Sequence, residues 1–81
     1  MTLAIVQSQS ESLSQAVGRN VRGLLGEQRI SQTVFARMVD TNIASLSRRL
    51  NGLYPINCDE LEQYARALGV TVERLMQGSA W

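Results

Sequence analysis

The sequence contains no histidine and no lysine, and it has only one cysteine and one proline. Histidine is a common acid–base group in catalysis and the commonest metal ligand, so its absence excludes the sites that depend on it. The sequence also lacks a metal-ligand cluster and a glycine-rich phosphate loop. We therefore expect that the protein is not an enzyme and that it has no catalytic residue, metal, cofactor or small-molecule ligand.

Long apolar runs are missing as well. The longest, residues 3–6, is far too short to span a membrane, and no basic residue precedes it as in a signal peptide. Cys58 is the single cysteine and cannot form an internal disulfide, which fits a reducing compartment. With 81 residues there is room for one small domain. These features favour a cytoplasmic protein without membrane association.

Positive charge is unevenly distributed along the chain. The formal net charge is only +1, but residues 19–54 carry six arginines and two acidic residues, a local charge of +4. Residues 55–81 carry two arginines and four acidic residues, a local charge of −2. A basic segment of this kind is typical of a nucleic-acid footprint. The alternative for Arg48-Arg49 is a solvated helix end, where the dipole favours cations.

Apolar residues follow the period of a helix, and no alternating strand pattern is present. A stripe at i, i+4, i+8, i+11 and i+12 predicts a first helix from about residue 10 to residue 28. Its start stays open, because Ser8 and Ser12 each have Glu or Gln three residues later, as in a capping box. The stripe consists of Leu13, Val17, Val21, Leu24 and Leu25.

Two short helices joined by a tight turn are predicted next. Ser31 is the N-cap of one helix, which ends near Val39 because residues 40–42, Asp-Thr-Asn, have turn and capping chemistry. The following helix spans residues 43–50, and Asn51-Gly52 terminates it. The inner face of the first of these two helices is expected to comprise Phe35, Met38 and Val39.

Two further helices complete the prediction. Asn57, with Glu60 three residues later, caps a helix that Gly69 closes, and Thr71 caps a final short helix. Pro55 keeps the residue before it out of the helical region. We therefore predict an all-α fold, a compact bundle of about five short helices with a helix-turn-helix, in one domain of residues 10–77. The stripe of the fourth helix consists of Leu61, Tyr64, Ala65 and Leu68.

The two helices within residues 32–50 have the features that a helix-turn-helix requires. Ala36 is small enough for a close helix crossing, and Leu46 is an apolar residue midway along the second helix. Outward residues between 42 and 48 are short or apolar, so this helix can approach base edges in the major groove. Arg48, one turn further on, can reach a guanine or a phosphate.

An ordered set of residues extends this pattern across most of the chain: Ser31, Gln32, Phe35, Ala36, Val39, Asp40, Thr41, Asn42, Leu46, Ser47, Arg48, Arg49, Leu50, Asn51, Gly52, Asp59, Glu60, Leu61, Ala65, Ala67, Leu68, Gly69, Val70 and Leu75. With these spacings, residues 17–76 resemble the lambda-repressor/Cro-type (Xre-like) helix-turn-helix family. The resemblance implies a sequence-specific, double-stranded DNA-binding transcriptional regulator, a repressor or Cro-like protein of a phage or prophage. Its recognition helix, about residues 42–50, would lie in the major groove of an operator.

The same resemblance implies roles for single residues. Two departures bear on them: Asp40 stands where the family commonly has glycine, and Arg49 stands where it commonly has an apolar residue. Asp tolerates the left-handed region better than most residues, so the turn is expected to be strained but kept. The second departure leaves open whether Arg48 or Arg49 reads bases. The base-contacting positions are Asn42, Ile43, Ala44, Ser45, Ser47 and Arg48; the phosphate-contacting positions are Arg22, Gln32, Arg49, Asn51 and Tyr54.

The two ends and the partners complete the set of expectations. Residues 1–9 are either a tail or an arm exchanged with a second subunit, and residues 78–81, with Trp81, form a C-terminal tail. A homodimer is expected because paired half-sites multiply affinity. A regulator of this kind would lie at the nucleoid of a bacterial host. The alternatives are an antitoxin-type autoregulator that binds a toxin, and a protein-interaction module that has lost DNA binding.

Overall fold

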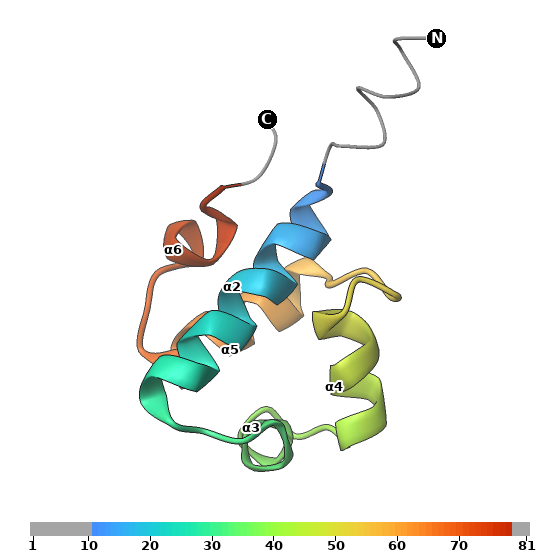
Figure 1. The fold of residues 1–81 in the computed structure, drawn as a ribbon, viewed down its shortest axis with the longest axis vertical. Coiled ribbons are helices and arrows are strands. Elements are labelled where there is room, and N and C mark those ends of the chain that lie inside the picture. Colours follow the sequence, from blue (N-terminus) through green and yellow to red (C-terminus); the bar gives the residue numbers. More distant parts are fainter. Residues whose placement is uncertain (1–10, 79–81) are drawn as a thin grey trace, which may run out of the picture.

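The computed structural model describes residues 11–78, which form five helices and no strands (Figure 1). The prediction of an all-α fold is therefore confirmed for this part of the chain. The predicted arm of residues 1–9 and the tail residues 79–81 lie outside the described residues. The helices are α2 (Leu13–Gln28), α3 (Gln32–Met38), α4 (Ile43–Leu50), α5 (Cys58–Leu68) and α6 (Val72–Met76).

Each helix begins at a side-chain cap, which explains why the sequence located the helices well. Ser12 caps α2 in a capping box with Gln15, so the helix begins at Leu13 and not at residue 10. Of the two starts that the sequence left open, the structure has the one at Ser12. The other caps accept hydrogen bonds from the backbone three residues on; they are Ser31, Asn42, Asn57 and Thr71.

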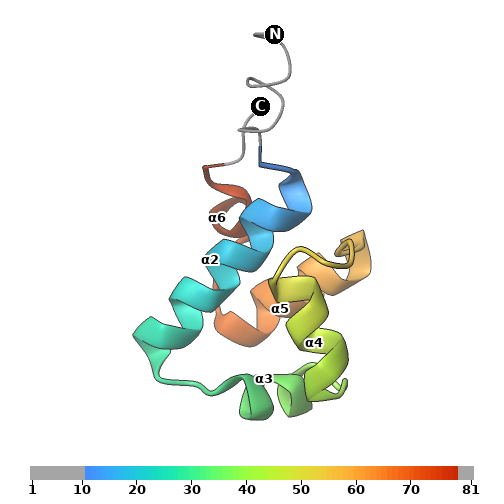
Figure 2. The ribbon, with the colours of Figure 1, turned by 45° about the vertical axis from the view of Figure 1, so that its right-hand side comes forward.

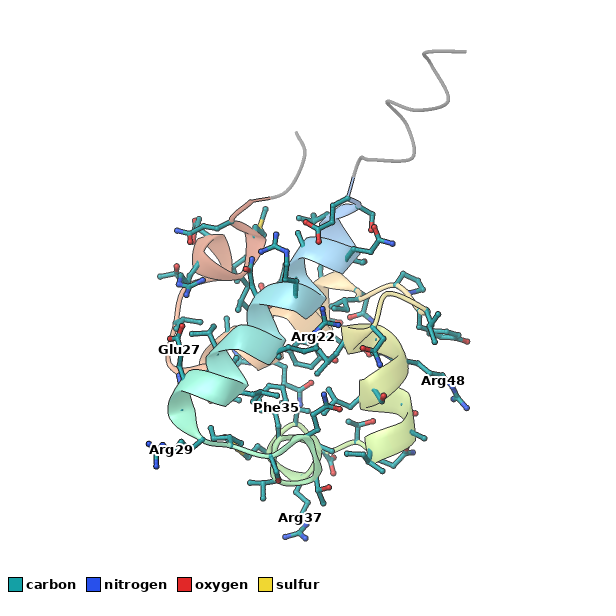
Figure 3. The ribbon with its side chains drawn as sticks, viewed as in Figure 1. Arg22, Glu27, Arg29, Phe35, Arg37 and Arg48 are labelled. Carbon is teal, nitrogen blue, oxygen red and sulfur yellow. The ribbon has the colours of Figure 1, made fainter. Side chains whose placement is uncertain are left out.

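The core lies between α2 and the other helices. All five residues of the α2 stripe belong to it or pack against it. Phe35 of α3 lies fully buried against Tyr64 of α5, with ring centroids 5.5 Å apart (Figure 3). The expectation that Met38 lies on the inner face of α3 is wrong, since Met38 is 45% exposed. Ala36 takes that place, because the short helix turns Phe35, Ala36 and Val39 toward the core.

The helices are arranged around α2, which packs against α4, α5 and α6, while α3 packs against α4. In both ribbon views α3 and the start of α4 form one end of the molecule (Figures 1 and 2). The start of α2 and the end of α6 lie together at the opposite end. None of the helices within residues 11–78 has the length and apolar character needed to cross a bilayer.

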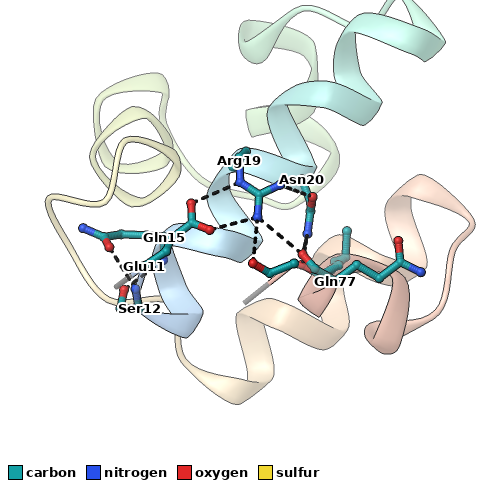
Figure 4. Close-up of polar contacts among 8 residues, drawn as sticks. Glu11, Ser12, Gln15, Arg19, Asn20 and Gln77 are labelled. Atoms are coloured by element: carbon teal, nitrogen blue, oxygen red, sulfur yellow. Dashed lines mark hydrogen bonds and ion pairs between the residues drawn. The ribbon is translucent and has the colours of Figure 1, made fainter. Parts of the chain in front are cut away.

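A polar cluster joins the start of α2 to the end of α6 (Figure 4). Arg19 pairs with Glu11 at 2.9 Å and donates to the backbone oxygens of Gln77 and Gly78. The side-chain amide of Asn20 donates to the backbone oxygens of Leu75 at 2.7 Å and Gln77 at 2.8 Å. These contacts join the residues at the end of α6 to the first turns of α2.

The hydroxyl of the buried residue Tyr64 makes the stability of the fold depend on pH in the alkaline range. Burial, with the nearby negative charge of Glu60, raises the pKa of Tyr64 to about 12. A raised folded-state pKa stabilises the fold below the ordinary value near 10, and this stability is lost as the pH rises from about 10 through 12. We expect Tyr64→Phe to lose less stability than the wild type between about pH 9 and 11, as measured by urea unfolding. An equal alkaline loss in both proteins would contradict this assignment.

Candidate nucleic-acid interface

The turn between α3 and α4 is fixed by backbone and side-chain hydrogen bonds. Asp40 has a φ of +58°, so it adopts the left-handed conformation expected at this position. The amide of Thr41 donates to the carbonyl of Ala36 at 2.8 Å. The side chain of Gln63 in α5 donates to the carbonyl of Val39 at 2.9 Å. The turn is thus joined to α5 by the side chain of Gln63.

The predicted base-contacting residues come together on the outer part of α4. Leu46 and Leu50 are fully buried, and this burial determines which side of the helix faces outward. Asn42, Ile43, Ala44 and Arg48 are exposed, and Ser45 and Ser47 are partly exposed. Arg48 points away from the body of the protein (Figure 3). The N-cap Asn42 uses its side-chain oxygen to accept from the amide of Ser45 at 2.8 Å.

Two residues of α2 hold the C-terminal end of α4. Gly18 is buried, and a Cβ placed on it would lie 2.5 Å from the carbonyl oxygen of Leu50. The two helices therefore approach more closely than any residue with a side chain would allow. Arg22 donates to the same carbonyl oxygen and, at 3.0 Å, to the side-chain oxygen of Asn51 (Figure 3). The close approach at Gly18 and the hydrogen bonds from the Arg22 guanidinium together set the position of α4.

Arg48 and Arg49 are neighbours in sequence but differ in surroundings. Arg48 is exposed, whereas the Arg49 side chain is 22% exposed and pairs with Glu60 at 2.8 Å. The Arg49 guanidinium also lies 5.2 Å from the centre of the Tyr54 ring. An open hollow of about 160 Å³ lies between these two arginines, Ser45 and Tyr54. Of the two arginines, Arg48 is the one that faces outward.

The predicted phosphate-contacting residues surround α4. Gln32 is the first residue of α3 and is partly exposed, while Tyr54 is 54% exposed in the loop after α4. Asn51 lies between Arg22 and Ser47, and its side-chain amide donates to the Ser47 hydroxyl at 3.2 Å. These four residues lie in α2, α3 and the loop after α4, whereas Arg49, the fifth predicted phosphate contact, lies within α4.

Two residues that shape this interface were missed from the sequence. Gly18 stands in the middle of a helix among core positions, where glycine is unfavourable unless another backbone comes close, so its position was the available signal. Gln63 gave no signal, because an exposed-looking glutamine on a helix is ordinary. Its contact with Val39 depends on how α5 packs against the turn.

Comparisons with known proteins agree with this geometry. No curated protein sequence shows a significant match to the chain. Among solved structures, the clp gene regulator ClgR from C. glutamicum superposes with a TM-score of 0.73 at 21% identity. The match covers 78% of this chain and 82% of that one, and it shows a shared fold. The model of a helix-turn-helix family, HTH_3, matches residues 21–75. The chain therefore belongs to the lambda-repressor-like helix-turn-helix family and is a DNA-binding transcriptional regulator.

Proposed function

We propose that the protein binds an operator in double-stranded DNA with α4 in the major groove, as a repressor or Cro-like regulator. The observation that carries the proposal is the outer surface of α4. It presents short or apolar side chains over its first turn and an outward arginine one turn later. A helix with such a surface can approach base edges closely in a groove about 12 Å wide.

Each residue on this surface has a contact that its chemistry favours. Ile43 and Ala44 suit thymine methyl groups, and the amide nitrogen of Asn42 can donate to a base or a groove wall. Ser45 and Ser47 lie toward the groove walls. Arg48 is the residue with the reach and charge for a bidentate contact to guanine. Phosphate contacts are assigned to Arg22, Asn51 and Tyr54, which are exposed, and to Gln32, which is partly exposed.

Substitution of Arg48 tests this assignment. Arg48→Ala should cost about 1–3 kcal/mol of operator affinity and should relax the preference at one base pair, because the bidentate contact is lost. The measurement is competition binding with a set of operators mutated one base pair at a time. Arg66→Ala in α5 makes the same charge change on an exposed residue away from α4 and should leave the preference unchanged. Equal weakening of all sequences by Arg48→Ala would instead make Arg48 a phosphate contact.

The assembly on DNA belongs to the same proposal. Two copies on half-sites about 34 Å apart, one helical turn, would multiply the affinity of a single small domain. Such a dimer would act at the nucleoid in the bacterial cytoplasm, on a phage or prophage gene. Sedimentation of the protein with one and two half-sites tests this: cooperative two-to-one binding supports a dimer, and independent binding of single copies opposes it.

A further inference from the structure

Arg49 occupies an inward position of the recognition helix. It lies three residues after Leu46, which is fully buried, and so is close to Leu46 on the helix surface. The Arg49 side chain is 22% exposed, and its partner Glu60 is 23% exposed. Arg49 therefore lies between α4, the following loop and α5, on a different side of the helix from Arg48.

The Arg49 guanidinium makes three contacts at once. Its Nε donates to Oε2 of Glu60 in α5 at 2.8 Å. Its Nη1 donates to the carbonyl oxygen of Ser45, one turn back in α4, at 3.0 Å. Its Cζ lies 5.2 Å from the centroid of the Tyr54 ring, in the loop between the two helices. One side chain thus connects α4, the loop and α5.

Glu60 is committed at both of its oxygens. While Oε2 accepts from Arg49, Oε1 accepts from the backbone amide of Asn57 at 3.0 Å and completes the capping box of α5. The ion pair therefore anchors both ends of the loop between α4 and α5. Arg49 lies at the end of α4, and Glu60 accepts from Asn57 where α5 begins. A carboxylate and a guanidinium that are both mostly buried cannot be separated cheaply, since each would be left without its partner.

We propose that Arg49 is a positioning residue for DNA recognition. Together with the burial of Leu46 and Leu50, its contacts with Glu60 and Tyr54 help to fix the rotation of α4 and the path of the loop, so that Arg48 faces the bases and Tyr54 the backbone. Arg49 itself makes no phosphate contact. This inference builds on the proposed operator binding and assigns Arg49 a role different from the phosphate contact that the family resemblance implies.

A charge-neutral pair of substitutions tests the proposal. Arg49→Met removes the guanidinium but keeps an apolar side chain of similar length, and Glu60→Gln keeps an acceptor for the capping box of α5. The double variant Arg49→Met/Glu60→Gln has the net charge of the wild type. Operator affinity, affinity for unrelated DNA and the salt dependence of both are measured for the wild type, both single variants and the double variant.

A positioning role predicts rescue. Arg49→Met should bind the operator about tenfold more weakly, whereas its affinity for unrelated DNA should fall much less. The reason is that Glu60, left without its partner, displaces the loop. Adding Glu60→Gln should bring operator affinity back to within about threefold of the wild type. The slope of log K against log[salt] should stay unchanged in the double variant, since no phosphate contact is lost.

A phosphate contact by Arg49 predicts the opposite. The double variant would then stay as weak as Arg49→Met, and its salt slope would be shallower by about 0.9. Either of these results overturns the proposal, as does wild-type affinity in Arg49→Met. Failure of the proposed function looks different, because the wild type itself would then show no preference for its operator. Thermal unfolding of all four proteins, run alongside, ensures that affinities are compared at a temperature where each is folded.

Discussion

Replacing Gly18 with alanine should lower the free energy of unfolding by about 2–3 kcal/mol, although alanine is the better helix former. A Cβ at this position would lie 2.5 Å from the carbonyl oxygen of Leu50 and 3.0 Å from its carbonyl carbon. Those atoms belong to backbone, so they cannot move aside as a flexible side chain does. The two helices must separate, and the hydrogen bond from Arg22 to the same oxygen weakens with them.

The matched control is the same substitution five residues along the same helix. Gly23 is exposed in α2, and a Cβ there would meet no atom within 4 Å. Gly23→Ala should therefore raise the free energy of unfolding by about 0.5–1 kcal/mol through helix propensity. Urea unfolding of both variants measures the two effects. Stabilisation by Gly18→Ala as well would show that α2 and α4 do not approach as closely as described.

A second large effect is expected from an acidic residue in the first turn of α4. Ala44→Glu should weaken operator binding at least about a hundredfold, because a carboxylate placed against DNA repels phosphate and cannot be accommodated at a base edge. The same carboxylate lies near the N-terminus of the helix, where negative charge is favourable by about 0.3–1 kcal/mol. The variant should thus be at least as stable as the wild type while losing DNA binding.

Gln77→Glu is the control for this variant, since it makes the same charge change on an exposed residue at the opposite end of the molecule. Gel-shift titration and thermal unfolding of the two proteins give affinity and stability side by side. Gln77→Glu should reduce affinity only slightly, and the reduction should vanish as salt is raised. If Ala44→Glu bound the operator as well as Gln77→Glu does, α4 could not be the helix in the groove.

Local chemistry explains why the helices could be predicted from the sequence. Ser31, Asn42 and Thr71 cap their helices through bonds to the backbone three residues on, so a short window of sequence contains the whole interaction. The α2 stripe was equally plain, because five apolar residues repeat on one side of a long helix. Met38 was misplaced because α3 has only seven residues, too few for periodicity to separate neighbouring positions.

The candidate interface was predictable only in part, because its geometry depends on contacts between distant residues. The outward position of residues such as Ala44 follows from the burial of Leu46, which the pattern indicated. The close approach at Gly18 and the pairing of Arg49 with Glu60 join different helices, so no local pattern specifies them. Sequence alone therefore left the choice between Arg48 and Arg49 open, and the ion pair of Arg49 with Glu60 in α5 separates their surroundings.

A salt titration of wild-type binding tests most directly whether this protein recognises an operator through α4. DNA flanking the protein's own gene and unrelated DNA of equal length are compared over a range of salt concentrations. We expect log K to fall steeply against log[salt], with a slope near −0.9 for each phosphate neutralised, and the flanking DNA to be preferred at every salt concentration. A flat salt response, or equal affinity for both DNAs, would contradict it.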